Sequence, residues 1–272
     1  MIRSWFGLTK TVFATDELTL LPHQQAIADI VAVHCRQGGL CLILGDPGVG
    51  KSCIKQSLQQ SADKRMVVLS VGRTMHTYMN TIKILCQAFS IDVEGSDFRC
   101  EKRLIEEAFS LCRAGKSLVT FIDDAHLLDM LTLRKLRLLF EEFPPNHNLV
   151  LVGQTTLLGP LSLKANDDIK SRITYSTIVG KLVNDDVEAF ILEELTKAGL
   201  GHNIFSSEAL GLLARSSDGL IRRAKNLCLS SLLEAVRDRK KEVGLEIVNR
   251  VLIQPHWRME AELPAHLNGA NI

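Results

Sequence analysis

Short apolar runs rich in β-branched residues alternate with stretches of helical periodicity over the first two thirds of the chain. The apolar runs cover residues 40–44, 66–71, 117–122, 149–152 and 173–175. Helical patterns cover 51–60, 76–90, 98–113 and 127–143, and an amphipathic helix precedes the first run. Continuous apolar strands that alternate with helices are typical of a parallel sheet covered on both faces. The pattern therefore predicts an α/β core with a five-stranded parallel sheet sandwiched by helices.

After Gly180 the strand pattern stops and only helical patterns follow. Asn184 and Ser206 are suitable N-caps for helices that reach about residues 198 and 215, and two more helical stretches cover 218–238 and 243–253. We therefore expect four regions, namely an N-terminal lead-in and helix (1–39), the α/β core (40–180), a small helical lid (181–253) and a flexible tail (254–272).

Composition narrows the class of protein. The 272 residues are 46% apolar and 23% charged, as in an ordinary globular protein, and the net charge of +1 gives no global basic field for nucleic acid. The seven cysteines show no CxxC pair and no zinc-type spacing, which favours reduced, buried thiols in a cytoplasmic protein. A signal-peptide pattern and a membrane-length apolar stretch are both missing, so we expect no membrane partner.

The strongest motif follows the first apolar run. It reads Gly45-Asp46-Pro47-Gly48-Val49-Gly50-Lys51-Ser52, with Cys53 next in the helix. The glycines let backbone N–H groups close around phosphate oxygens, Lys51 supplies charge to the β- and γ-phosphates, and the Ser52 hydroxyl suits Mg²⁺. A chance glycine-rich turn is the alternative, but the strand before the motif and the helix after it favour a nucleoside triphosphate site.

An acidic pair, Asp123 and Asp124, ends the third apolar run. In P-loop ATPases such a pair holds Mg²⁺ and the attacking water. We expect Asp123 on the metal side and Asp124 orienting or deprotonating the water. A helix N-cap is the alternative for Asp124.

Three further polar residues are candidates by position. Gln154 follows the strand 149–152, where it can reach the γ-phosphate or the water, although a simple turn residue is about equally consistent with the pattern. Arg172 precedes the last strand and Arg222 begins a helix of the lid. An arginine supplied by a neighbouring subunit accelerates hydrolysis by stabilising charge on the γ-phosphate, whereas position alone would make both surface charges.

Taken together, these motifs resemble those of the AAA+ ATPases. More narrowly, the chain is similar to the ExeA/GspA-like and TniB/TnsC-type group. The stretches that carry this resemblance are Trp5-Phe6-Gly7-Leu8, Leu21-Pro22-His23-Gln24-Gln25, Asp123-Asp124-Ala125-His126-Leu127-Leu128, Leu151-Val152-Gly153-Gln154, Ser171-Arg172-Ile173 and Gly219-Leu220-Ile221-Arg222-Arg223. Many secretion-type members have proline where this chain has Ile221.

The resemblance implies an ATPase that uses ATP and Mg²⁺ and oligomerises, so that each site lies between subunits. Arg172 would be the finger acting in trans, Arg222 the lid sensor, and Leu21, Pro22 and Gln25 part of the adenine pocket. In the transposition branch, ATP-bound subunits form a ring or helical filament on duplex DNA and recruit or stimulate a transposase. In the secretion branch a membrane span and periplasmic domains follow. The chain shows neither, which favours transposition.

The same resemblance indicates where DNA would bind. The regions are the loop after the second strand and the start of a later helix, with Arg73, Thr74, Arg99, Lys102 and Arg103 as candidates for sequence-independent phosphate contacts. The alternative for Arg99, Lys102 and Arg103 is the solvated face of an amphipathic helix.

Two other functions stay open on the sequence. One is a secretion-type or other ATPase that remodels protein partners without DNA. The other is an initiator-like or helicase-loader-like ATPase, although too few residues follow the last lid helix for the helix-turn-helix that such proteins often append. For the tail, both a partner-docking peptide anchored by Trp257 and plain disorder stay open.

Overall fold

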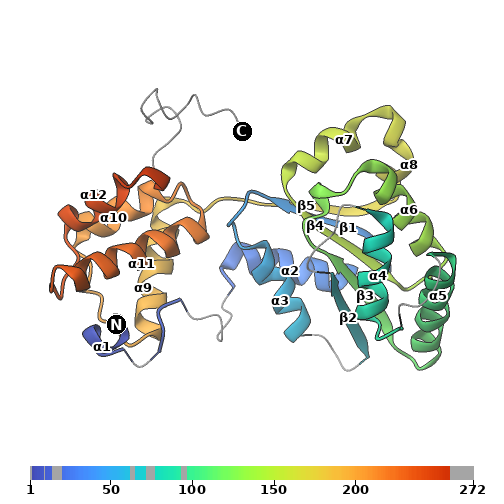
Figure 1. Cartoon of the computed structure of the whole chain (residues 1–272), viewed down its shortest axis with the longest axis horizontal. Helices are drawn as coiled ribbons and strands as arrows, with labels where there is room; N and C mark the ends of the chain where they lie inside the picture. The colour runs from blue at the N-terminus through green and yellow to red at the C-terminus, as the bar shows by residue number, and fades with distance from the viewer. Residues whose placement is uncertain are drawn as a thin grey trace. The chain divides into compact units, whose positions relative to one another are not determined.

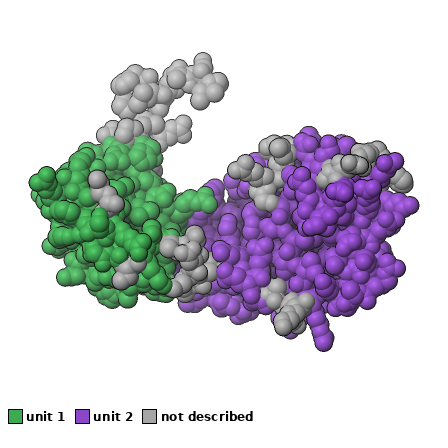
Figure 2. Space-filling view, turned by 60° about the horizontal axis from the view of Figure 1, so that its bottom comes forward, with its two compact units in different colours: residues 1–17, 181–272 green, residues 18–180 purple. Residues whose placement is uncertain are grey.

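The computed structural model describes residues 2–8, 10–13, 20–61, 65–71, 77–92 and 97–257. The chain forms two compact units, coloured separately in Figure 2: residues 18–180, and residues 1–17 together with 181–272.

The first unit contains the predicted sheet. Its strands are β1 (Gly39–Gly45), β2 (Met66–Val71), β3 (Ser117–Ile122), β4 (Asn148–Gly153) and β5 (Ile173–Val179). All are parallel, in the order β2-β3-β4-β1-β5. The five-stranded parallel sheet is therefore confirmed. Its central strand is β4, with β1 beside it, and almost every residue of these two strands is buried.

Helices cover both faces of this sheet (Figure 1). On one face lie α2 (Pro22–His34) and α3 (Lys51–Gln60), which contact β1. On the other lie α4 (Tyr78–Ala88), α5 (Asp97–Arg113) and α6 (Met130–Glu141). Leu42 and Leu44 pack into the apolar cluster under α4–α6. Because side chains alternate along a strand, the buried Cys41 and Ile43 point to the opposite face.

Two helix predictions in this unit need correction. The stretch 127–143 is not one helix: a 3₁₀ turn, η1 (Ala125–Leu127), is followed by α6, whose first turn is capped by Asp129 accepting from the Thr132 N–H at 2.6 Å. This cap separates the two helices. Residues 154–172, between β4 and β5, for which we predicted no element, form η2 (Thr155–Leu157), α7 (Leu158–Ser162), η3 (Lys164–Asn166) and α8 (Asp167–Lys170), each too short for a periodic pattern.

The second unit is helical. It contains α9 (Asn184–Lys197), α10 (Ser207–Ser216), α11 (Ile221–Arg237) and α12 (Leu245–Leu252). The predicted cap Ser206 accepts from the Ala209 N–H at 3.3 Å. Asn184 is instead the first helical residue, after Val183 at the cap position. The short η4 (Pro255–Trp257) follows α12, so the region after residue 253 begins with a 3₁₀ turn, and residues 258–272 lie outside the described part.

The N-terminal lead-in does not stay together. Its first helix, α1 (Ile2–Phe6), belongs to the helical unit, where Trp5 Nε1 donates to the Lys240 carbonyl at 3.1 Å and the Phe13 ring stacks on Phe190 at 6.2 Å. By contrast, α2 packs on the sheet. Two aromatic anchors thus assign the beginning of the chain to the helical unit, whereas the sequence suggested a single segment 1–39.

Two properties of the composition can be checked on the described residues. All seven cysteines are free thiols, and burial raises the pKa of Cys35 and Cys41 to about 12, so these two stay protonated. None of the described helices combines the length and the apolar character needed to cross a bilayer.

Candidate nucleotide-binding site

The glycine-rich loop joins β1 to α3 and has the backbone that its sequence predicts. Gly48 and Gly50 have φ values of 89° and 100°, in the left-handed region that favours glycine. At Gly45, a Cβ atom would lie 2.7 Å from the Val179 carbonyl oxygen. The α3 helix begins at Lys51 with a glycine before it, so no side chain caps its positive end. The loop is therefore a concave cradle of backbone with no room for a side chain at Gly45.

Lys51 lies across this loop. Its Nζ donates to the carbonyl oxygens of Gly45 and Asp46, at 2.8 and 2.9 Å. The ammonium group is thus held within the loop. Ser52 is exposed in the first turn of α3, Pro47 is exposed at the tip of the loop, and Cys53 is half-buried behind it.

A glutamine of α2 supports the loop from behind, and it is not the one that we named. Gln24 is 1% exposed; its Nε2 donates to the Val49 carbonyl at 3.1 Å and its Oε1 accepts from the Leu21 N–H at 3.2 Å. The predicted Gln25 is exposed and donates to Asp29 at 2.7 Å. Leu21 is half-buried and Pro22 exposed at the start of α2.

A signal for Gln24 was available in the sequence. It lies on the same helical stripe as the buried Ala28 and Val31.

The acidic pair and Gln154 lie at the same end of the strands as the loop, the carboxyl-terminal end. Leu44 of β1 pairs with Gly153 of β4, and Ile122 of β3 pairs with Leu151. Because β4 lies between β1 and β3, Gln154 follows the middle strand, with the loop on one side and Asp123 on the other. The carboxyl ends of parallel strands form the usual ligand edge of such sheets. This edge is where the sequence expected the three groups to meet.

The two aspartates differ in their surroundings. Asp123 accepts from Lys55 Nζ at 2.6 Å through Oδ2 and from the Asp124 N–H at 3.1 Å through Oδ1. Asp124 is exposed and has a left-handed backbone (φ 51°), and its side chain does not cap the following η1 turn. The N-cap alternative for Asp124 therefore has no hydrogen bond to support it. Lys55 was missed, since nothing in the sequence pairs residues 68 positions apart.

Arg172 lies at the opposite end of the strands, where the parallel strands begin. It precedes Ile173, which pairs with Leu40 at the beginning of β1. Its side chain is 62% exposed, and Nε is 3.1 Å from Oε1 of Glu141 at the end of α6. The arginine is therefore on the surface and held by a carboxylate of its own subunit.

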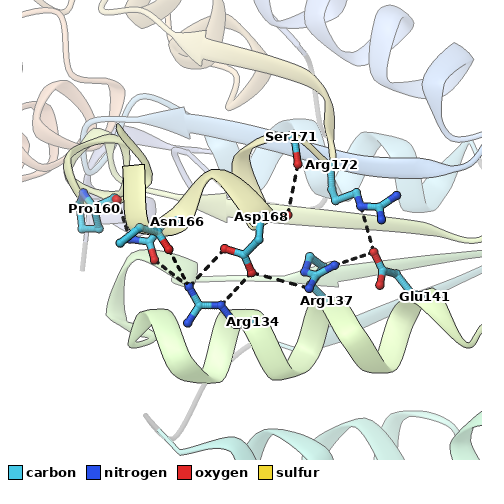
Figure 3. A network of polar contacts seen from close by, with 9 residues as sticks. Arg134, Arg137, Glu141, Pro160, Asn166, Asp168, Ser171 and Arg172 are labelled. Atoms are coloured by element: carbon cyan, nitrogen blue, oxygen red, sulfur yellow. Dashed lines mark hydrogen bonds and ion pairs between the residues drawn. The ribbon is translucent and has the colours of Figure 1, made fainter. Parts of the chain in front are cut away.

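Figure 3 shows the network that continues from this contact. Arg137 donates to Glu141 at 2.7 Å and lies 3.7 Å from Asp168, which in turn accepts from Arg134 at 2.8 Å. The hydrogen bond from Arg134 lowers the pKa of Asp168 below its ordinary value. These pairs join α6 to α8, the helix directly before Arg172.

The remaining predicted residues fall in three places. Arg222 is exposed in the first turn of α11, in the helical unit. On α5, Arg99 is exposed, Lys102 lies 3.8 Å from Glu106, and Arg103 donates to the Asp92 carbonyl at 2.9 Å. Two of these three cations thus have local partners, as the solvated-face alternative expects. Arg73 and Thr74 lie outside the described residues.

Comparisons with known proteins agree with this fold. Residues 34–161 match the family model described as an AAA domain. The general secretion pathway protein A of Aeromonas hydrophila is 27% identical over 245 residues, which cover 86% of this chain and 45% of that protein. This chain therefore spans less than half the length of that relative.

Solved structures give the same fold at lower identity. The ORC2 protein of Aeropyrum pernix, solved as ADPNP–ADP complexes, has a TM-score of 0.73 at 15% identity and covers 97% of this chain and 76% of its own. The ORC1 protein of the same organism, in complex with DNA, has a TM-score of 0.69 at 18% identity, covering 88% and 67%.

The matched AAA domain contains the cradle at the end of β1 and the acidic strand end beside it, and the fold is that of an AAA+ ATPase. Among AAA+ proteins the chain is similar to the secretion pathway protein of Aeromonas.

An AAA+ fold uses ATP and Mg²⁺, and the residues present fit both groups. The backbone cradle and the Lys51 ammonium suit a polyphosphate, and the hydroxyl of Ser52 and the carboxylate of Asp123 are the hard oxygen ligands that Mg²⁺ takes alongside phosphate and water. When bound, the metal ion neutralises charge on the phosphates.

Proposed function

We propose that this protein is an ATP-controlled assembly switch: ATP-bound subunits associate on duplex DNA, and the assembly recruits or activates a transposase. In this proposal Lys51 and Ser52 bind the Mg²⁺–triphosphate, Asp124 prepares the attacking water, Gln154 contacts the γ-phosphate or that water, and a neighbouring subunit supplies Arg172.

The observation that carries the proposal is the position of Arg172. It lies at the amino-terminal ends of the parallel strands. The phosphate loop lies at their carboxyl-terminal ends, one strand length away. A strand of seven residues spans about 20 Å, which an arginine side chain does not bridge. If Arg172 serves a phosphate, that phosphate must be on another subunit. ATP hydrolysis would then depend on assembly.

Duplex DNA is proposed as the track because of related structures and local charge. ORC1 of Aeropyrum pernix was solved in complex with DNA. In this chain Arg99 is exposed on α5, and Lys102 and Arg103 stand on the same helix. A few cations of this kind contact phosphates without reading bases, which suits an assembly with little sequence preference.

A second candidate is an ATPase that remodels protein partners without DNA. The similarity to the secretion pathway protein A favours it. An initiator-like function is a third, favoured by the likeness to the ORC proteins. The second candidate predicts assembly that ignores DNA; the third predicts assembly on DNA without any effect on a transposase.

Electron microscopy with duplex DNA and a slowly hydrolysed ATP analogue tests the proposal. We expect regular rings or filaments that require both the DNA and the nucleotide. The control is Lys51→Ala, which we expect to lose ATP binding and therefore assembly. Oligomers that form with nucleotide alone, and do not change when DNA is added, would contradict the proposal and favour protein remodelling. DNA-bound assemblies that leave strand transfer by the transposase unchanged would favour the initiator-like function.

A further inference from the structure

The Lys55–Asp123 ion pair places a lysine on the carboxylate expected to face Mg²⁺. Nζ of Lys55 is 2.6 Å from Oδ2 of Asp123, and the two side chains are only 15% and 20% exposed. Lys55 follows Lys51 by four residues on α3, so both ammonium groups project from the same face of the helix. One contacts the phosphate loop and the other contacts the acidic strand end.

Both oxygens of the Asp123 carboxylate are engaged. Oδ2 accepts from Lys55 and Oδ1 from the Asp124 N–H. A magnesium ion or one of its waters would therefore have to take Oδ2 from the lysine or share it. Sharing is unfavourable, because an ammonium and a divalent cation would meet on one carboxylate in a largely buried place, where salt and water screen their repulsion weakly.

We propose that Lys55 is an internal counter-cation of Asp123 that Mg²⁺ must displace when nucleotide binds. Its flexible four-carbon stem allows the ammonium to leave while α3 stays in place. Lys55 therefore raises the Mg²⁺ concentration needed to load the site, and it keeps Asp123 neutralised when the metal is absent. It acts through Asp123, as a positioning residue of the ATPase. This inference needs only the nucleotide site, so it does not rest on DNA or on a transposase.

The test compares Lys55→Met, which keeps most of the stem but removes the charge, with Lys55→Arg, which keeps the charge. Binding of a fluorescent ATP analogue is followed while MgCl₂ is titrated from a chelated baseline. We expect the half-saturating Mg²⁺ concentration of Lys55→Met to fall about fivefold to tenfold, in keeping with the modest strength of partly exposed ion pairs. Lys55→Arg should stay near the parent. Lys83→Met is the matched control, since Lys83 is an exposed lysine on α4.

A second readout separates displacement of Lys55 from a merely structural role. Without nucleotide and Mg²⁺, Lys55→Met should melt at a lower temperature than the parent, because Asp123 loses its partner; with both added, the difference should close. The proposal would be overturned if the melting difference persists with nucleotide and Mg²⁺ added and Lys55→Met needs Mg²⁺ at within about twofold of the parent concentration. It would also be overturned if Lys55→Met needs more Mg²⁺ than the parent. If Lys55→Met does not fold, Lys55→Gln is measured in the same way.

Discussion

Lys51 and Arg172 lie at opposite ends of the strands of the same parallel sheet. Lys51 follows the carboxyl end of β1, and Arg172 precedes Ile173, which pairs with Leu40 near the amino end of that strand. The two cations expected to act on one triphosphate therefore belong to different ends of the α/β unit. Each subunit then presents a phosphate cradle at one end of its strands and an exposed arginine at the other end. This is the arrangement that a head-to-tail ring or filament requires.

Substitution of Asp124 by asparagine should separate ATP binding from hydrolysis. Asp124 is exposed and its side chain does not cap η1, so Asp124→Asn removes a carboxylate with little structural cost. We expect nucleotide affinity within about twofold of the parent, hydrolysis reduced by about 10²-fold or more, and an assembled form that persists. Nucleotide binding and phosphate release measure the two effects. Hydrolysis at the rate of the parent protein would show that Asp124 does not prepare the water.

Two adjacent glutamines offer a matched pair for the loop contact. Gln24 is buried against Val49 and Leu21, so Gln24→Ala leaves a buried carbonyl and a backbone N–H without these partners. We expect unfolding free energy to fall by about 1–3 kcal/mol, with weaker nucleotide binding. Gln25→Ala, on the exposed side of α2, should change stability by no more than about 0.5 kcal/mol. Chemical unfolding of both variants gives the comparison, and equal effects would contradict the assignment.

The buried His147 should make stability depend on pH. Its ring stacks on Phe140 with centroids 4.7 Å apart, and burial lowers the pKa of His147 to about 3. The unfolded chain binds a proton below about pH 6.5 and the folded chain does not, so stability is full above that pH and falls as the pH drops toward 3. At pH 5 the loss from this residue, relative to its full contribution well above pH 6.5, should be about 2 kcal/mol.

The comparison variant for this prediction is His147→Gln, which keeps a group able to hydrogen-bond Thr120. Its unfolding free energy should decline less than that of the parent over the same pH range. Burial also lowers the pKa of His34, so both proteins keep the contribution of that residue. Parallel pH profiles for the two proteins would show that His147 does not carry the effect.

Local patterns predicted the sheet and the cradle, and failed where distant elements meet. The runs around Leu42, Val119 and Val150 are apolar on both faces because the strands are covered on both sides. These continuous apolar runs therefore predict the strands directly from the sequence. At the edge of the sheet, β5 alternates polar residues with apolar ones, and only its first part was recognised. The Lys55–Asp123 pair depends on folding and leaves no local sequence signal.

The most direct test of the central claim mixes two subunits that are each inactive for a different reason. Asp124→Asn is expected to bind ATP and carries Arg172, whereas Arg172→Ala keeps Asp124 and lacks the arginine finger. In an equimolar random assembly, about a quarter of the interfaces combine an intact Asp124 with an Arg172 from the neighbour. We predict that ATPase activity rises well above the mean of the two variants alone, and that mixing Asp124→Asn with the double variant restores nothing. The claim would be contradicted if cross-linking shows that mixed oligomers form but their ATPase activity stays as low as that of the two variants alone.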